Sequence, residues 1–496
     1  MNLAVALPVV LPLSFGAVSV LLWRSHWAQR IFGVAGTGMM LGAAVWLLFE
    51  TAARGHVVME VGSWPAPFGI VLVSDMLAAI MVVLTGIIGF ATAIYSLSDI
   101  GRMSEKFGFY PLLHLLLAGV NGAFLTGDIF NLYVWFEVML VASFALLILG
   151  GERAQMEGAI KYVTLNLFSS MVFLTAVGLT YGLTGTLNMA HIGERLASVE
   201  NHGLITVIAM LYLVAFGVKA AAFPFFFWLP ASYHTPKVAV SALFAALLTK
   251  VGVYALFRVF TLIFNQEVGY THDILLWVAV LTMLTGVLGA AAQYEFRRIL
   301  SFHIISQIGY MILGLALFTP LALVGGVFYI MHHIIVKANL FLISGITFMM
   351  KGTHELRLLG GIYRTHPLLG VLFLIPALSL AGLPPLSGFF AKFIIIRAGI
   401  EAEAYWAVAV ALVVGLLTLY SMVKIWAEVF WKKQPEGVAT NAASDRSLIW
   451  MWIPVVMLAS MTVAIGLYGQ PIYAMASMAA EQLLDPSRYI EAVLHR

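Results

Sequence analysis

The sequence predicts an all-α polytopic membrane protein, on the strength of its composition and the length of its apolar runs. Of 496 residues, 62% are hydrophobic and only 10% are charged, against roughly 45–50% and 25% in ordinary soluble domains. About 20 consecutive apolar residues cross a bilayer as a helix. Such runs follow one another here with short loops between them, so we expect one polytopic domain without a separate extramembrane fold.

The lengths of the apolar runs, and the charged or proline-rich residues that separate them, predict about fourteen transmembrane helices. They lie near residues 3–23, 31–50, 70–96, 109–126, 129–150, 158–182, 204–223, 237–262, 273–294, 299–317, 321–349, 368–397, 405–430 and 448–468. The segment 472–494 mixes apolar and charged residues too closely to span, which indicates a surface helix or tail.

Lysine and arginine mark alternate loops, and this pattern predicts the orientation. The loops after odd-numbered spans contain Arg24, Arg30, Arg102, Lys106, Arg153, Arg297, Arg298, Lys351, Arg357, Arg364, Lys432, Lys433 and Arg446. The loops on the other side contain few basic residues. Because positively charged loops stay in the cytoplasm, we expect the first group there and both termini outside.

Composition also excludes several function classes. The net charge of +3 is too small to indicate nucleic-acid binding. The absence of cysteine excludes disulfides, iron–sulfur clusters and thiolate metal sites. No glycine-rich loop is followed by a phosphate-binding lysine, so no ATP site is expected. We therefore predict no cofactor.

Ionisable residues inside the spans are the candidate functional residues, because a charge at membrane depth is costly and needs a partner, water or a role. Glu137, Lys219, Lys250 and Lys392 lie well within spans five, seven, eight and twelve, and function is the favoured interpretation for them. Lys161 and Lys424 lie closer to span ends, where a lysine reaches the interface instead. Span ten contains His303, Ser306 and Gln307.

Span eleven contains His332, His333 and Lys337. His333 and Lys337 are four residues apart and share a helix face, whereas His332 points about 100° away. A histidine in a membrane can also be a neutral hydrogen-bonding residue between helices. The residues alone therefore leave open which histidine belongs to a charged path.

Two proline breaks interrupt the spans near these lysines. Lys219 precedes Pro224 in VKAAAFPFFFWLP, and Lys392 follows Pro385 in LPPLSGFFAK. Proline removes a backbone donor, so spans seven and twelve are expected to be discontinuous helices. One such helix in each half of a chain is typical of inverted-repeat transporters. We therefore divide the chain into N-terminal helices (1–108), a first five-helix repeat (109–262), a second inverted repeat (263–430), and a last transmembrane helix with a C-terminal surface segment (431–496).

Proton transfer is the chemistry that this set of residues favours. Burial lowers the pKa of a lysine toward neutrality, whereas a nearby carboxylate stabilises the ammonium. If Glu137 approaches Lys219, a change in their separation switches the proton occupancy of the lysine. Lys250, the histidine and lysine of span eleven, and Lys392 would then form a lateral series of exchangeable sites linked by water.

Three stretches carry a family resemblance. KAAAFPFFFWLPASYHTPKVAVSALFAALLTKVGVYALFRVF, SFHIISQIGYMILG and LPPLSGFFAK resemble the antiporter-like subunits shared by respiratory complex I and the Mrp sodium/proton antiporters. The chain is most similar to the D-subunit family of Mrp. Complex I relatives usually have an acidic residue, alanine and histidine after WLP, where Ala231, Ser232 and Tyr233 stand here. Lys392 differs from the glutamate of the M-type subunit of complex I.

The resemblance implies a proton-translocating subunit of a hetero-oligomeric Na⁺/H⁺ antiporter in the bacterial plasma membrane. Such a subunit is a secondary transporter and no enzyme; its partners are the other subunits, lipids, protons and Na⁺. The family's key residues fall on Glu137, Lys219, Lys250, a span-eleven histidine and Lys392, and the match HIIVK favours His333. The sodium site is not identified. Asp128, near Asn131, is a candidate for which a structural role is favoured.

Two other classes stay open. The chain would have a similar proton path as a subunit of a redox-driven complex, either complex I or a membrane-bound hydrogenase. Alternatively, it is a scaffold whose buried charges only hold helices together.

Overall fold

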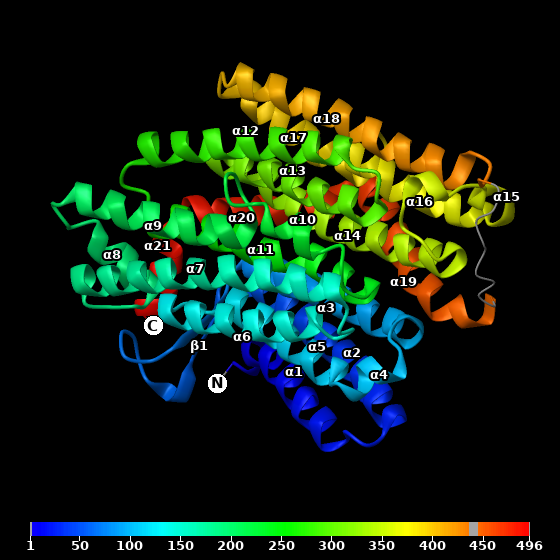
Figure 1. Cartoon of the computed structure of the whole chain (residues 1–496). Helices are drawn as coiled ribbons and strands as arrows, with labels where there is room; N and C mark the ends of the chain where they lie inside the picture. The colour runs from blue at the N-terminus through cyan, green and yellow to red at the C-terminus, as the bar shows by residue number, and fades with distance from the viewer. Residues whose placement is uncertain (1, 436–444, 496) are drawn as a thin grey trace.

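The structure, a computed structural model, describes residues 2–435 and 445–495, with the side chains of 445–447 left out. Long helices dominate it and run side by side as a bundle (Figure 1). The helices are α1 (Leu3–Leu21), α2 (His26–Arg54), α3 (Met76–Asp99), α4 (Arg102–Lys106), α5 (Phe109–Leu125), α6 (Ile129–Leu147), α7 (Arg153–Thr184), α8 (Met189–Leu196), α9 (His202–Ala220), α10 (Trp228–Ser232), α11 (Val238–Leu262), α12 (Val268–Ala292), α13 (Phe296–Ala316), α14 (Pro320–Lys351), α15 (Ile362–Thr365), α16 (Pro367–Ala381), α17 (Ser387–Glu401), α18 (Tyr405–Ile425), α19 (Asp445–Leu467), α20 (Gly469–Leu484) and α21 (Pro486–Leu494). Short helical turns are η1 (Val61–Ser63), η2 (Leu356–Leu358) and η3 (Trp426–Trp431), and the strands are β1 (Val57–Glu60) and β2 (Val71–Ser74).

The predicted all-α polytopic class is confirmed. Within the described residues, twelve helices are long and apolar enough to cross a membrane, and α5 and α16 are shorter apolar helices. Each predicted span coincides with one of these helices, and 368–397 contains α16 and α17 together. The count of fourteen spans and the inverted repeats stay predictions.

The predicted span 70–96 begins later than its apolar run. Residues 71–74 form β2, which pairs antiparallel with β1 in the register Val57↔Ser74. Asp75 then caps α3, because its side chain accepts a hydrogen bond from the Ala78 N–H at 2.9 Å. Hydropathy cannot separate a buried strand from the first turn of a helix, since both are apolar.

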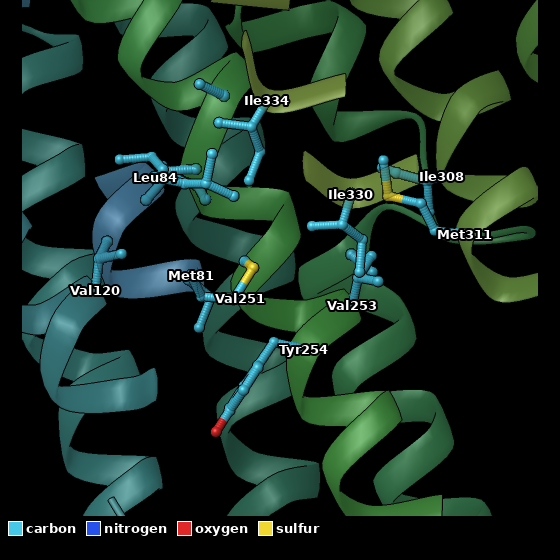
Figure 2. Close-up of a cluster of buried hydrophobic side chains, with 14 of the residues drawn as sticks. Met81, Leu84, Val120, Val251, Val253, Tyr254, Ile308, Met311, Ile330 and Ile334 are labelled. Atoms are coloured by element: carbon cyan, nitrogen blue, oxygen red, sulfur yellow. The ribbon is translucent and has the colours of Figure 1, made fainter. Parts of the chain in front are cut away.

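Three helices form the centre of the bundle. All of the most apolar window of α11 is buried, and 94% of the corresponding windows of α13 and α14. Apolar side chains of α3, α5, α11, α13 and α14 meet in this region (Figure 2); those labelled include Met81, Val120, Val251, Ile308 and Ile330. The candidate residues on α11, α13 and α14 are therefore surrounded by protein.

The loops gather at two ends of the bundle. In Figure 1, α4 and α15 lie at the right, whereas β1, α8 and α21 lie at the left. The right end carries Arg102, Lys106, Arg357 and Arg364, and we call it the basic end. The left end is called the opposite end. Arg446 lies outside the described side chains.

Both proline breaks end a helix with the same motif. After α9, the Ala221 N–H bonds to the Val218 carbonyl and the Ala222 N–H to the Gly217 carbonyl. After α16, Gly382 N–H bonds to Ser379 and Leu383 N–H to Leu378 in the same pattern. These are Schellman caps, which satisfy carbonyls that the interrupted helix leaves unpaired.

The two continuations differ. Beyond the first break the chain forms only the five-residue helix α10, whereas beyond the second it forms the fifteen-residue helix α17. The discontinuity predicted for span twelve thus has two similar halves, and that for span seven has one long half and one single turn.

The C-terminal segment, expected as a surface helix or tail, is helical. Its first part, α20, packs against α14, α3 and α11, and buries Ala476, Ala479, Ala480 and Leu483. One face of this segment is therefore part of the bundle.

Candidate functional site

Lys219 sits at the end of α9, where the helix breaks. Its ammonium donates to the Asn166 carbonyl and to the Ser170 hydroxyl, both on α7 and both at 3.2 Å. The Phe136 ring of α6 lies 5.5 Å from the same nitrogen. The lysine is thus held by a carbonyl, a hydroxyl and an aromatic face inside the bundle.

Glu137, the next residue of α6, is half-buried and faces this lysine without touching it. No ion pair within 4.0 Å joins the two side chains among the described residues, although the carboxylate acts electrostatically on Lys219. One buried Glu137 oxygen, Oε1, has no hydrogen-bond partner in the described structure. Glu137 and Lys219 are therefore near enough for their charges to interact, but they do not form an ion pair in the described structure.

Lys250 follows on α11, whose backbone touches the end of α9. A Cβ placed on Gly252 would lie 2.5 Å from the Ala220 nitrogen, so only glycine permits this approach. Lys250 is fully buried, and its ammonium donates to the Ala245 carbonyl of its own helix at 2.5 Å. Its charge acts on His333 and Lys337 of α14.

The two histidines of α14 point to different neighbours, as their spacing predicts. His333 and Lys337 are fully buried, and neither has a hydrogen-bond partner within residues 2–435 and 445–495. His332 instead shares a hydrogen bond with the Ser387 hydroxyl at 2.8 Å, at the start of α17. The Lys250 charge thus acts on His333, whereas His332 forms its hydrogen bond at the second helix break.

Lys392 completes the set. It lies in α17, and its ammonium turns back to the Ala381 carbonyl at the break, 3.0 Å away. The Tyr310 ring lies 5.0 Å from this ammonium and stacks on Tyr329 with ring centroids 5.1 Å apart. Tyr329 in turn meets the His332 ring edge-on at 5.7 Å. Lys392 and His332 are therefore connected through the same break and the same aromatic pair.

The structure brings all seven predicted residues into one series, which we call the buried series. Its members are Glu137, Lys219, Lys250, His333, Lys337, His332 and Lys392. Charge effects link Glu137 with Lys219, Lys250 with both His333 and Lys337, and His332 with both His333 and Lys392. Between Lys219 and Lys250 the link is the contact of their backbones, and no direct side-chain bond joins them in the described structure.

Sequence reasoning missed the residues that hold the series in place. Asn166 and Ser170 on α7, and Ser387 and Tyr310 near the second break, contact the lysines and His332. Asn166 contributes its backbone carbonyl, which any residue type provides, so the sequence signal on this face of α7 was the Ser170 hydroxyl. Nothing in the sequence indicated that this face meets Lys219.

Asp128 has a capping role at the start of α6. Its carboxylate accepts a hydrogen bond from the Asn131 N–H at 2.7 Å. Burial raises its pKa to about 6, although the N–H groups of Asn131 and Phe130 work against this. Among the described residues no three His, Asp or Glu side chains cluster as metal ligands.

Comparisons with known proteins place the chain. The family model described as "NADH:quinone oxidoreductase/Mrp antiporter, TM" matches residues 126–418. The chain is 48% identical to the D subunit of the Na⁺/H⁺ antiporter of Alkalihalophilus pseudofirmus and 39% identical to that of Bacillus subtilis, covering 100% of each pair of chains.

Solved structures show the same fold. A chain of the Mrp complex from Dietzia sp. is 35% identical, with a TM-score of 0.91 and complete coverage of both chains. A chain of respiratory complex I from Thermus thermophilus is 25% identical, with a TM-score of 0.82 over 97% of this chain and 99% of that one. This chain therefore belongs to the family of membrane subunits shared by NADH:quinone oxidoreductase and the Mrp antiporters, and within that family it is similar to the antiporter D subunits.

Proposed function

We propose that this chain is the proton-translocating D-type subunit of a multisubunit Na⁺/H⁺ antiporter, and a secondary transporter. The observation that carries the proposal is the buried series. Seven ionisable side chains from α6, α9, α11, α14 and α17 follow one another through the interior of a membrane bundle. Ionisable residues inside a membrane are costly, so a connected set of them is expected to serve ion transfer.

Glu137 and Lys219 act as the switch. In this structure Lys219 is held by Asn166 and Ser170, and the Glu137 carboxylate forms no ion pair with it among the described residues. A small movement of α6 or of the end of α9 would bring the two charges together and stabilise the ammonium, and the reverse movement would favour proton release. The Schellman break beside Lys219 gives that helix end freedom that a continuous helix lacks.

The rest of the series passes the proton laterally. His333 and Lys337 lack protein partners within the described residues, and buried polar groups of this kind are commonly satisfied by ordered water. A water file beside them would join Lys250 to the second break, where His332 and Lys392 meet. Each group then accepts one proton and passes one on.

Loop charge and the relatives of the chain support a setting for the subunit. The basic end faces the cytoplasm of a bacterial plasma membrane, and both termini lie outside. Other subunits of the complex provide the sodium route. The family also serves redox-driven complexes, but the identity of 48% to an antiporter D subunit, against 25% to the complex I chain, favours the antiporter.

Sodium-dependent dissipation of a proton gradient tests this function. Inverted vesicles from an antiporter-deficient host are prepared with all subunits expressed, and wild type is compared with Lys219→Ala and Glu137→Gln at matched assembly. We expect exchange to fall to the host background in both variants, with the complex intact.

Lys161→Gln is the matched control, because Lys161 is an exposed lysine that pairs with Glu157 at 2.6 Å on the surface of α7. It should retain exchange. Undiminished exchange in Lys219→Ala would make the buried charges structural and favour the scaffold.

A further inference from the structure

His303 on α13 is a buried ionisable group that the buried series does not include. It is fully buried, and neither ring nitrogen has a hydrogen-bond partner in the part of the chain that the structure describes. His333 and Lys337, on the neighbouring helix α14, have unpartnered nitrogens as well. Ordered water between α13 and α14 would satisfy these unpartnered groups.

The charges around His303 come from three different helices. Lys337 of α14, Lys392 of α17 and Lys424 of α18 all act on it, and His303 acts on His333. From α11, Lys250 acts on His333 and Lys337. Within the described residues, α12 contributes no charge at His303. The charges of the buried series and of Lys424 thus both act on the histidine, and the series does not include Lys424.

The position of His303 along α13 shows toward which end of the bundle it lies. α13 begins at Phe296 at the basic end, and His303 lies about 10 Å along the helix from there at 1.5 Å per residue. Lys424 lies at the same end: its ammonium donates to the carbonyls of Ala291 at 2.8 Å and Gln293 at 2.7 Å, where α12 ends. The Lys424 side chain is only half-buried. His303 is thus placed between the interior and the basic end.

We propose that His303 is a further proton-carrying residue, which connects the buried series with the basic end of the bundle beside Lys424. The inference rests on the proposed function and adds a route to it. One ring nitrogen accepts a proton from water next to Lys337, and the other ring nitrogen gives its proton to water on the Lys424 side. The imidazole is left neutral in its other tautomer, so protons balance, and rotation of the ring restores the starting state.

His114 provides a matched control. It is also fully buried with both ring nitrogens unpartnered among the described residues, but it lies on α5 against α1 and α2. Its neighbours include Phe15, with ring centroids 6.0 Å apart, and within the described residues no charged side chain acts on it. A variant of His114 therefore reproduces the loss of a buried imidazole without the connection to the lysines.

The absence of native cysteine allows a test that does not depend on transport. His303→Cys, His114→Cys and the exposed Arg298→Cys are each introduced into the complete complex. A small, permanently charged thiol reagent is added to inverted and to right-side-out vesicles, and labelling of this chain is measured. We expect His303→Cys to be labelled only from the face that carries Arg298, at least about tenfold faster than His114→Cys, because a dry apolar site excludes a charged reagent.

Labelling of His303→Cys at the His114→Cys rate, or only from the opposite face, would overturn the route. Exchange provides the second readout: His303→Gln should lose exchange at matched assembly, and His114→Gln should retain it. If Lys219→Ala loses exchange while His303→Gln keeps it, this inference fails and the proposed function stands. If Lys219→Ala keeps exchange, the proposed function fails. The labelling result still decides whether water from the basic end reaches His303.

Discussion

Lys219 and Lys392 reach the breaks of their helices from opposite directions. Lys219 lies in the last turn of α9, before its break, and Lys392 lies in the second turn of α17, after its break. The Lys392 ammonium nevertheless returns to the Ala381 carbonyl, which ends α16. A break in a membrane helix frees carbonyls, and an ammonium is a natural partner for them. Both ammonium groups bond to a backbone carbonyl, but Lys392 uses a carbonyl at the break of its own span, whereas Lys219 uses one within α7.

Ser387 holds His332, and its removal tests whether that contact serves transfer. Ser387→Ala leaves the bonded ring nitrogen of His332 without its 2.8 Å partner. We expect slower exchange, with a stability loss of about 1–3 kcal/mol, because the Ser387 hydroxyl bonds to Ser379 as well as to His332. Vesicle exchange and thermal unfolding of the purified complex measure the two effects. Ser421→Ala removes a hydroxyl that, among the described residues, donates to the Leu417 carbonyl of its own helix, and it should leave exchange unchanged.

Asp128 predicts a pH effect on stability that is separate from transport. Burial raises its pKa to about 6, so between its ordinary pKa and 6 the folded state holds the extra proton. Stability therefore falls as pH rises through this window. Above it, the full free-energy cost of burying the ionised Asp128 carboxylate is present. Asp128→Asn keeps the cap and removes the charge.

At pH 8 we expect Asp128→Asn to raise the free energy of unfolding by on the order of 1–2 kcal/mol, seen as a higher thermal midpoint. At pH 4 we expect little effect. Exchange should persist. Loss of sodium-dependent exchange at normal stability would instead favour Asp128 as a cation contact.

At the scale of elements, the two breaks share a Schellman cap but differ in the residue that adopts the left-handed conformation. Ala221 has φ 59° and ψ 41°, and Gly382 has φ 96°. A side chain in this region costs roughly 1–2 kcal/mol relative to glycine. The first break is therefore strained and the second is not.

Exchanging these residues gives opposite predictions. Gly382→Ala adds the left-handed cost, and its Cβ would lie 2.8 Å from the Lys392 Cδ, so we expect lower stability and displacement of the lysine with loss of exchange. Ala221→Gly should be tolerated and raise stability by about 0.5–1 kcal/mol. Thermal unfolding and vesicle exchange are measured on both variants. If the two variants have the same stability and the same exchange, the proposed role of the caps is contradicted.

At the scale of the whole molecule, the C-terminal helices close the opposite end of the bundle. Arg258 of α11 forms a buried ion pair with Asp75 at 2.6 Å, and the Tyr489 ring of α21 covers its guanidinium at 5.1 Å. Gln482 of α20 accepts from the Met76 N–H at 2.7 Å and donates to the Gly55 carbonyl. Burial opposes the ionisation of Asp75, but Arg258 and the Ala78 N–H outweigh it and hold the pKa of Asp75 below its ordinary value.

Breaking this pair should destabilise the protein strongly. Asp75→Asn leaves the buried Arg258 charge uncompensated, and such changes cost about 3–5 kcal/mol. Glu157→Gln removes one partner of an exposed pair, and we expect it to leave stability nearly unchanged. Thermal unfolding of the two variant complexes measures the difference, and similar midpoints would refute the importance of the buried pair.

The sequence by itself determined the membrane class, the places of the helices, the two breaks and the buried charges. These features depend on the free energy of putting each short segment into lipid, which is a local property of its residues. It did not show that 71–74 pairs with 57–60, because a strand needs its partner.

Only the tertiary structure decided which groups meet. Asn166 and Ser170 hold Lys219, His332 bonds to Ser387, the Lys250 charge acts on His333, and Asp75 pairs with Arg258. All of these depend on packing between segments distant in the chain. Many packings satisfy the same apolar lengths equally well. Side-chain contacts between helices select one of them, and no single segment carries that information.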